Sequence, residues 1–148
     1  MQNHSDDASS GWTSYSCSYG DYFINLLKSA NNNGYIISPK FACPDNCNIA
    51  YSVAAKYYKG AGVGSSYNSA TVYVGATSNT STANKSANVH SINGTTSTNG
   101  NGFTTVSGSI TLSPSNPYMS VSHNNPKRYS AIPNGYLGVR DITINYSL

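Results

Sequence analysis

The chain has 148 residues, a formal net charge of +3 and only 9% charged residues, with no glutamate among them. The length predicts one domain, and the lack of a basic stripe argues against a nucleic-acid-binding protein. No apolar run approaches the roughly 18 residues of a membrane span, so membrane insertion is not expected.

Residues 1–10 are polar and are expected to be a flexible N-terminal lead; they lack the basic and apolar regions of a signal peptide. Residues 11–148 are expected to form a single domain. If the protein is secreted, a signal has been removed; if it belongs to a virus particle, none is needed. The composition is rich in Ser, Thr, Asn and Gly and includes 13 tyrosines, which favours β structure with polar turns over helix.

Alternating side chains predict strands along the chain, bounded by Gly, Pro and Asn turn signals. The clearest is Asn48–Tyr58, whose odd positions are Ile, Tyr, Val, Ala and Tyr. Since a strand directs alternate side chains to opposite faces, these odd positions predict a buried face. In chain order, the expected strands are residues 14–19, 22–28, 35–38, 48–58, 70–75, a short edge strand near 87–92, 103–112, 118–122 and 135–148.

The last expected strand changes the parity of its apolar residues between Val139 and Ile142. A one-residue change of parity predicts a β-bulge, which we place at Arg140-Asp141. Eight to ten strands without a helical pattern predict an all-β fold, namely an antiparallel two-sheet β-sandwich that is jelly-roll-like. The side chains expected in its core are Trp12, Tyr15, Ile24, Leu26, Ile36, Phe41, Ile49, Tyr51, Val53, Val72, Val74, Val106, Ile110, Leu112, Val121, Leu137, Val139, Ile142 and Ile144.

Three cysteines are present, and two of them flank the turn residues Pro44-Asp45-Asn46. A disulfide between Cys43 and Cys47 is sterically plausible and is the favoured interpretation. Three free thiols in a reducing compartment are the alternative. A zinc site is disfavoured, because this spacing alone is a weak signal and only three histidines are available.

Catalytic motifs are missing from the sequence, and the chain is not expected to be an enzyme. Glycoside hydrolysis usually needs two carboxylates, and the five aspartates are scattered. His90 and His123 lie in or beside polar loops without a triad motif around them. The Gly-rich residues 60–64 do not open a helix, so they are interpreted as a flexible connection.

Tyrosines near the expected loops are the candidate ligand-binding residues. An aromatic ring can stack on the apolar face of a sugar while its hydroxyl forms a hydrogen bond. Two groups of tyrosines, together with one basic pair, form this predicted surface: Tyr57, Tyr58 and Tyr67; Tyr118, Tyr129 and Tyr136; and Lys127 with Arg128.

Five short fragments follow one another in the chain: Gly11-Trp12, Tyr35-Ile36-Ile37-Ser38-Pro39, Tyr51–Tyr58, Val72-Tyr73-Val74-Gly75 and Gly138–Ile144. Together they resemble the jelly-roll modules of Bacteroidetes surface proteins, of the cleaved-adhesin or choice-of-anchor type, which are related in shape to galactose-binding-like and carbohydrate-binding modules. The resemblance implies a non-catalytic module for adhesion or glycan attachment, with Trp12 in the core. Some such modules hold calcium in Asp-rich loops, but this chain has no acidic loop beyond Asp6-Asp7, so no cofactor is expected.

Two functions from different classes therefore stand side by side. The first is a secreted or cell-surface binding module whose partner is a glycan or a surface protein of a host or partner cell. The second is a structural or assembly protein of a virus particle, fibre or pilus, which would form an oligomer.

Overall fold

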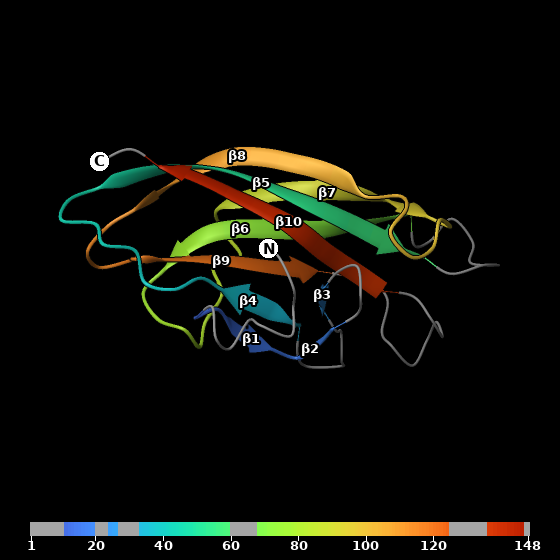
Figure 1. The fold of residues 1–148 in the computed structure, drawn as a ribbon, viewed down its shortest axis with the longest axis horizontal. Helices are drawn as coiled ribbons and strands as arrows, with labels where there is room; N and C mark the ends of the chain where they lie inside the picture. Colours follow the sequence, from blue (N-terminus) through green and yellow to red (C-terminus); the bar gives the residue numbers. More distant parts are fainter. Residues whose placement is uncertain (1–10, 20–23, 27–32, 60–67, 125–135, 147–148) are drawn as a thin grey trace.

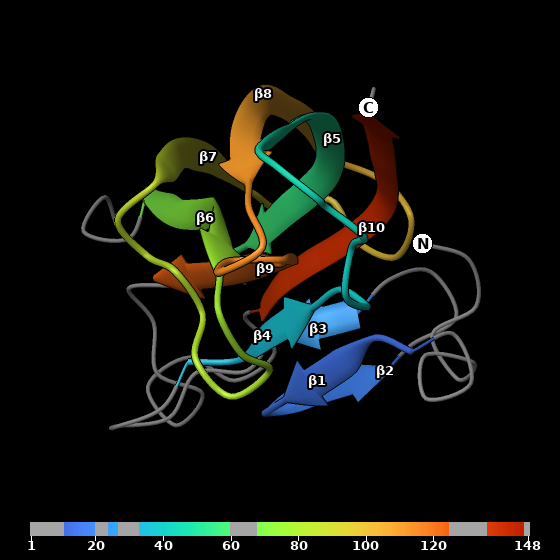
Figure 2. The same cartoon turned by 90° about the vertical axis from the view of Figure 1, so that its left-hand side faces the viewer.

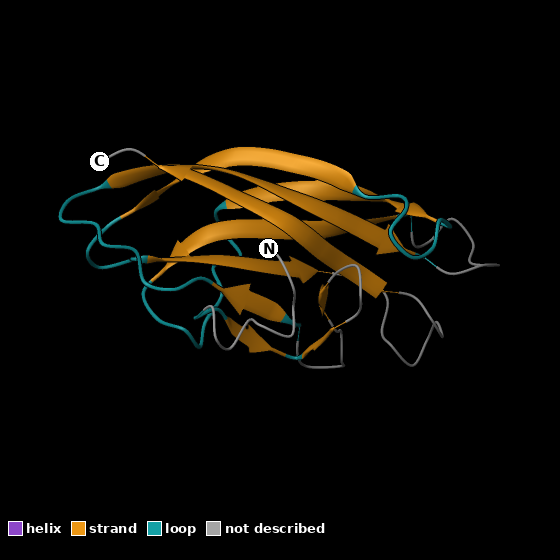
Figure 3. Ribbon diagram, in the orientation of Figure 1, coloured by secondary structure: helices purple, strands orange, loops and turns teal. Residues whose placement is uncertain are grey.

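The computed structural model describes residues 11–19, 24–26, 33–59, 68–124 and 136–146. These residues contain ten strands and no helix (Figure 3), so no described helix could span a membrane. The strands are β1 (Thr13–Tyr15), β2 (Cys17–Tyr19), β3 (Ile24–Leu26), β4 (Tyr35–Ile37), β5 (Cys47–Tyr58), β6 (Ser69–Thr77), β7 (Asn88–Thr95), β8 (Thr104–Leu112), β9 (Tyr118–Asn124) and β10 (Tyr136–Tyr146). The all-β prediction is confirmed.

The strands are hydrogen-bonded into one path, β1-β4-β9-β6-β7-β5-β10-β3-β2, with β8 paired to β5. All pairs are antiparallel except a short one between the ends of β5 and β7, where Tyr57 faces Gly94 and Tyr58 faces Thr95. This short pair links β1, β4, β9, β6 and β7 to the remaining strands, so that all ten belong to one hydrogen-bonded sheet. The sheet is curled (Figure 1). The two-sheet sandwich therefore stays a prediction.

The path begins and ends at strands that are consecutive in the chain. Only Ser16 separates β1, which pairs with β4, from β2, which pairs with β3. Ser16 has a φ of 52°, an uncommon backbone conformation for a residue with a Cβ. The single strand expected over residues 14–19 is therefore broken at Ser16, and the chain passes there between the two ends of the curled sheet (Figure 2).

The long central strand follows its sequence pattern. The odd positions of β5 are buried, and β5 pairs with β8 along one edge and with β10 along the other. The bulge is also confirmed, because the register of β10 against β5 shifts between Arg140 and Thr143. Asp141, within this shift, has a φ of 50°.

The segment expected as a short edge strand near residues 87–92 is β7, which has eight residues. It pairs with β6 from Asn88 to Asn93, and only Gly94 and Thr95 pair with β5. The expected strand is therefore confirmed, and it is longer than expected and joined to β5 at its end.

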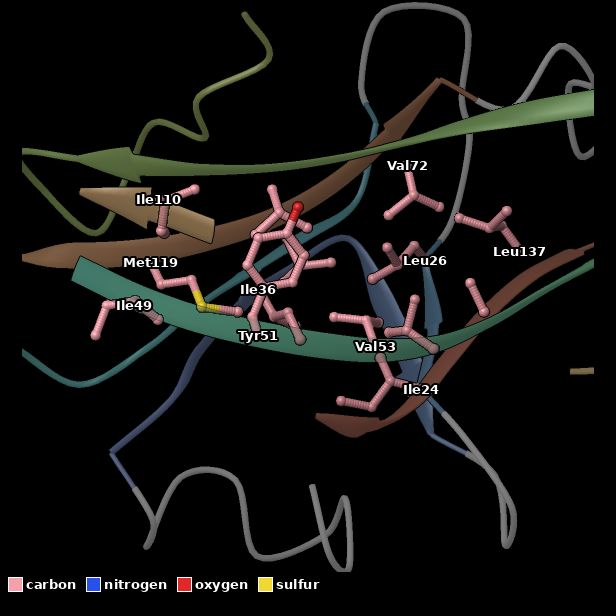
Figure 4. Packing of buried hydrophobic residues seen from close by; sticks show 14 of the residues in the cluster. Ile24, Leu26, Ile36, Ile49, Tyr51, Val53, Val72, Ile110, Met119 and Leu137 are labelled. Atoms are coloured by element: carbon pink, nitrogen blue, oxygen red, sulfur yellow. The ribbon is translucent and has the colours of Figure 1, made fainter. Parts of the chain in front are cut away.

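The core consists of apolar side chains that come from most strands of the curled sheet (Figure 4). Most of the predicted core residues are fully buried, while Trp12, Phe41, Val106, Ile142 and Ile144 are partly buried and pack against the cluster. The expectation that Tyr15 lies in the core is wrong, because this residue is 43% exposed. Further buried apolar residues that were not in the expected set are Ile37, Cys43, Cys47, Ala54, Ala55, Tyr57, Ala70, Ile92 and Met119.

Candidate functional site

The predicted loop surface is only partly described. Tyr67, Lys127, Arg128 and Tyr129 lie outside the described residues. Tyr57 is fully buried, so we leave it out of the candidate site. Tyr118 is half-buried at the start of β9, at the opposite end of the sheet from the tip of β5 (Figure 1).

Tyr58 and Tyr136 are brought together by the pairing of β5 with β10. They are directly opposite in register, and their rings stack with centroids 5.1 Å apart at an interplanar angle of 28°. The ammonium of Lys56 lies 5.4 Å from the ring centroid of Tyr136. This is the one part of the predicted surface that the described structure assembles.

Beside that tyrosine pair, two cations hold the segment before β8 against the sheet. The fully buried Lys56 donates from Nζ to the carbonyl oxygen of Asn99 at 2.9 Å, and Arg140 donates from Nη2 to that of Gly100 at 3.1 Å. The guanidinium of Arg140 also lies 4.0 Å from the ring centroid of Phe103. Burial, followed by the charge of Arg140, lowers the pKa of Lys56. Both cations are thus engaged by the protein itself, which indicates a structural role.

A cleft elsewhere in the structure is more accessible to a ligand than the Tyr58–Tyr136 pair. A cleft of about 520 Å³ lies between β1, β4 and the loop that follows β6; its described lining residues are Tyr15, Asn33, Tyr35, Ser81, Thr82, Ala83 and Lys85. We call it the Tyr15 cleft. Its volume is within the range of about 300–1,000 Å³ that is usual for small-ligand sites. In Figure 2 the loop after β6 descends beside β4 and β1.

The aromatic part of the Tyr15 cleft follows from strand register. Tyr15 on β1 is directly opposite Tyr35 on β4, and the ring centroids are 5.1 Å apart at an interplanar angle of 21°. Directly opposite residues on neighbouring strands bring their side chains together on one face. Tyr35 covers one face of the Tyr15 ring, and Tyr15 is 43% exposed, so part of this residue is accessible at the cleft.

The polar wall of the cleft is the loop of residues 78–87, which is tied to the sheet. The hydroxyl of Tyr35 donates to the carbonyl oxygen of Ser81 at 2.9 Å, and the hydroxyl of Thr77 donates to that of Thr82 at 2.7 Å. Ser120 Oγ accepts a hydrogen bond from the backbone N–H of Asn84 at 2.9 Å. A loop fixed in this way is ordered before any ligand arrives, which reduces the entropy lost on binding.

Turns inside the loop add to this order. The side-chain oxygen of Asn79 accepts from the N–H and hydroxyl of Ser81, both at 2.9 Å. The side-chain oxygen of Asn84 accepts in the same way from Ser86, at 3.0 Å for both bonds. These Asx-type turns replace backbone hydrogen bonds that the loop cannot make. The many Asn and Ser residues of this tract therefore build a defined wall.

The phenol of Tyr35 is a hydrogen-bond donor at the wall of the cleft. Burial, and then the neighbouring Tyr15 and Cys17, raise the pKa of Tyr35, so its phenol stays protonated and donates to Ser81. Among the described residues there is no group of three or more His, Cys, Asp or Glu that could hold a metal ion. The cleft instead presents an aromatic ring, hydroxyl groups, an amide and one ammonium.

The predicted cysteine pair lies away from the cleft, in the turn before β5. Cys43 and Cys47 are both buried thiols in this structure, and the disulfide is not formed in it. Burial, and then the hydrogen bond and charge of Cys47, raise the pKa of Cys43 to about 11. The thiols are neighbours, and their pairing as a disulfide stays a prediction.

Sequence patterns missed the cleft for a physical reason. An unbroken strand over residues 14–19 would have placed Tyr15 on the same side as Cys17, facing the core. The positive φ of Ser16 breaks that strand. Tyr35 and Lys85 are distant from Tyr15 in the chain, and only strand pairing and the loop after β6 bring them together.

No protein-family model matches the chain, and no curated protein matches it. Solved structures are similar in backbone. A cleaved adhesin domain of Lys-gingipain from Porphyromonas gingivalis is 13% identical, with a TM-score of 0.48 over 91% of each chain. The enzymatically active domain of a bacteriophage CBA120 tailspike protein is 12% identical, with a TM-score of 0.49 over 99% of this chain and 21% of that one.

The N-terminal cellulose-binding domain of a β-1,4-glucanase from Cellulomonas fimi is 12% identical, with a TM-score of 0.43 over 100% of this chain and 96% of that one. Cleaved adhesin domains, which the sequence resembles, are among these structures. They are likenesses of backbone, so the functional argument below rests on the side chains.

Proposed function

We propose that this chain is a non-catalytic binding module that works on a cell surface or in the extracellular space, and that it binds a glycan in the Tyr15 cleft. The observation that carries this proposal is the exposed ring of Tyr15, stacked on Tyr35 within a cleft that has polar walls. The described lining contains no carboxylate, so the pair of carboxylates that glycoside hydrolysis usually needs is not found there.

A sugar ring matches these groups in type. Its apolar C–H face packs against an aromatic ring, and its hydroxyls both donate and accept hydrogen bonds. Ser81, Thr82 and Asn33 supply groups that can bond such hydroxyls. The wall is ordered in advance by the hydrogen bond from Tyr35 to Ser81, so binding does not have to order it.

The test is a glycan array, followed by calorimetry on a glycan that binds. Tyr15→Ala should weaken binding about tenfold, which corresponds to about 1.4 kcal/mol and is near the upper end for an aromatic stack. Tyr15→Phe should keep most of the affinity, because it keeps the ring. Tyr58→Ala is the matched control, since it truncates a half-buried stacked tyrosine at another place. Loss of binding in Tyr58→Ala but not in Tyr15→Ala would refute the cleft as the site.

The loop surface predicted from the sequence is the alternative place for a glycan or a surface protein to bind. Among its described members, Tyr58 and Tyr136 are the two whose rings stack, and the Tyr58→Ala variant tests this pair directly. We also retain two structural proposals: that the curled sheet is a jelly-roll-like sandwich over residues 11–148, and that Cys43 and Cys47 form a disulfide under oxidising conditions.

One observation favours the second class of function, an assembly subunit of a virus particle, fibre or pilus. Within the described residues β8 pairs only with β5, and its sequence TTVSGSITL contains no charged residue and no proline. Edge strands usually carry such residues to prevent pairing with another chain. Light scattering after size-exclusion chromatography separates the two functions: a stable polymer supports assembly, and a monomer supports the binding module.

A further inference from the structure

We propose that the Tyr15 cleft prefers anionic sugars, with the ammonium of Lys85 binding their carboxylate or sulfate group. The inference rests on the proposed glycan binding and names the class of glycan. It comes from the distribution of charge in the cleft: Lys85 is the single charged side chain among the described lining residues, and it is exposed.

The charge of Lys85 is not neutralised within the described part of the chain. The carboxylates there are Asp45, in the turn before β5, and Asp141, in the bulge of β10. Asp141 lies 3.4 Å from Nε of Arg140, and this is the one salt bridge found among the described residues. A cleft lined by one sign of charge attracts ligands of the opposite sign.

The backbone that carries Lys85 is held on both sides. Asn84 donates from Nδ2 to the carbonyl oxygen of Ala76 at 2.8 Å, and Ser86 donates its N–H back to Asn84 at 3.0 Å. The loop also packs closely on β6, because a Cβ on Gly75 would lie 2.8 Å from Cγ of Asn84. The ammonium therefore extends from a fixed point beside the Tyr15–Tyr35 pair.

A lysine ammonium is a compact charge with three donors, so it does not distinguish a planar carboxylate from a sulfate by geometry. We therefore expect both kinds of anionic sugar to bind. An exposed charge pair contributes modestly, and we expect an anionic sugar to bind up to about fivefold more tightly than its neutral counterpart. Salt screens such a pair, so the preference should disappear in 1 M NaCl.

The experiment uses an array in which neutral glycans are matched with their sialylated, uronate and sulfated counterparts, followed by calorimetry on one matched pair. Lys85→Gln should remove the preference, because it lowers the affinity for the anionic member more than the affinity for the neutral member, and Lys85→Arg should retain the preference. Lys40→Gln is the control, because Lys40 is also exposed but lines a different groove with Trp12 and Phe41.

Each result of this experiment either supports or overturns the preference for anionic sugars. Equal binding of neutral and anionic members, or an equal loss of the preference in Lys40→Gln, overturns this inference and leaves the proposed glycan binding in place. Binding to no glycan on the array overturns both. A preference for the carboxylated members alone, sensitive to Lys85→Gln, supports the inference and narrows it to sialic or uronic acids.

Discussion

The hydroxyl of Tyr51 on β5 lies 2.6 Å from Nε2 of His90 on β7. Asn88 donates from Nδ2 both to the carbonyl oxygen of Ser109, at 2.6 Å, and to the Tyr51 hydroxyl, at 3.1 Å. The Tyr51 oxygen accepts from Asn88, and the bond between Tyr51 and Nε2 of His90 runs in the direction that the histidine tautomer sets. Burial lowers the pKa of His90, which favours its neutral form. His90 and His123 are the residues opposite Val72 on either side of β6.

This network predicts a loss of stability in acid. Burial lowers the pKa of His90 in the folded protein below its usual value, so between the two values the unfolded chain binds more protons than the folded chain. The free energy of unfolding should therefore be insensitive to this group above about pH 6.5 and should fall as the pH decreases through the folded-state pKa. Urea unfolding at pH 7.5 and pH 5 measures this change.

The control for that experiment is His90→Gln, which cannot titrate. The stability difference between the wild type and His90→Gln should be smaller at pH 5 than at pH 7.5, because the wild type alone must protonate this site. Other titrating groups, His123 among them, are present in both proteins and cancel in the difference. A stability difference that does not change with pH would contradict a lowered pKa of His90 in the folded protein.

The second prediction concerns the hydrogen bond that joins the cleft wall to β4. Tyr35→Phe keeps the ring stacked on Tyr15 but removes the bond from the Tyr35 hydroxyl to Ser81. We expect a loss of about 0.5–1.5 kcal/mol in the free energy of unfolding, with faster amide exchange in residues 78–87. Tyr15→Phe is the control, because no hydrogen bond of the Tyr15 hydroxyl is seen within the described residues. Equal effects of the two variants would show that the wall does not depend on this bond.

The third prediction tests the close approach of the loop to β6. Gly75→Ala would place a Cβ 2.9 Å from Cβ of Ala87 and 2.8 Å from Cγ of Asn84. Overpacking of this kind usually costs about 1–3 kcal/mol. Gly94→Ala, in β7, should cost less, because its nearest neighbour, at 3.0 Å, is the flexible side chain of Lys59. Chemical denaturation of the two variants should rank them in that order, and the reverse order would be inconsistent with a loop packed on Gly75.

The fourth prediction concerns the backbone of Ser16. At a φ of 52°, a β-branched side chain is strongly disfavoured, whereas glycine is not. Ser16→Val should therefore be less stable than Ser16→Gly, by about 1 kcal/mol or more. At Ser18, an exposed position within β2, the order should reverse, because strands favour valine over glycine. Thermal unfolding of the four variants measures both orders, and a Ser16→Val variant as stable as Ser16→Gly would show that the backbone of Ser16 does not disfavour a β-branched residue.

The sequence by itself determined the features that depend on local alternation. The odd positions of β5 are buried as their pattern predicts. The parity change in the last strand marks the bulge at Arg140-Asp141. Both follow from the two-residue period of a strand, which is a property of neighbouring residues and can be counted along the chain.

Only the tertiary structure decided which side of each strand other segments would cover. Lys56 lies on the even side of β5 and is nevertheless fully buried, because Phe103 and the carbonyl of Asn99 come from residues over 40 positions away. Tyr15 fits a core pattern and is nevertheless exposed. The positive φ of Ser16 ends β1 after Tyr15, and β1 pairs with β4. The Tyr15 cleft is a product of this pairing and of a polar loop whose order comes from hydrogen bonds to the sheet, and neither is encoded in a local period.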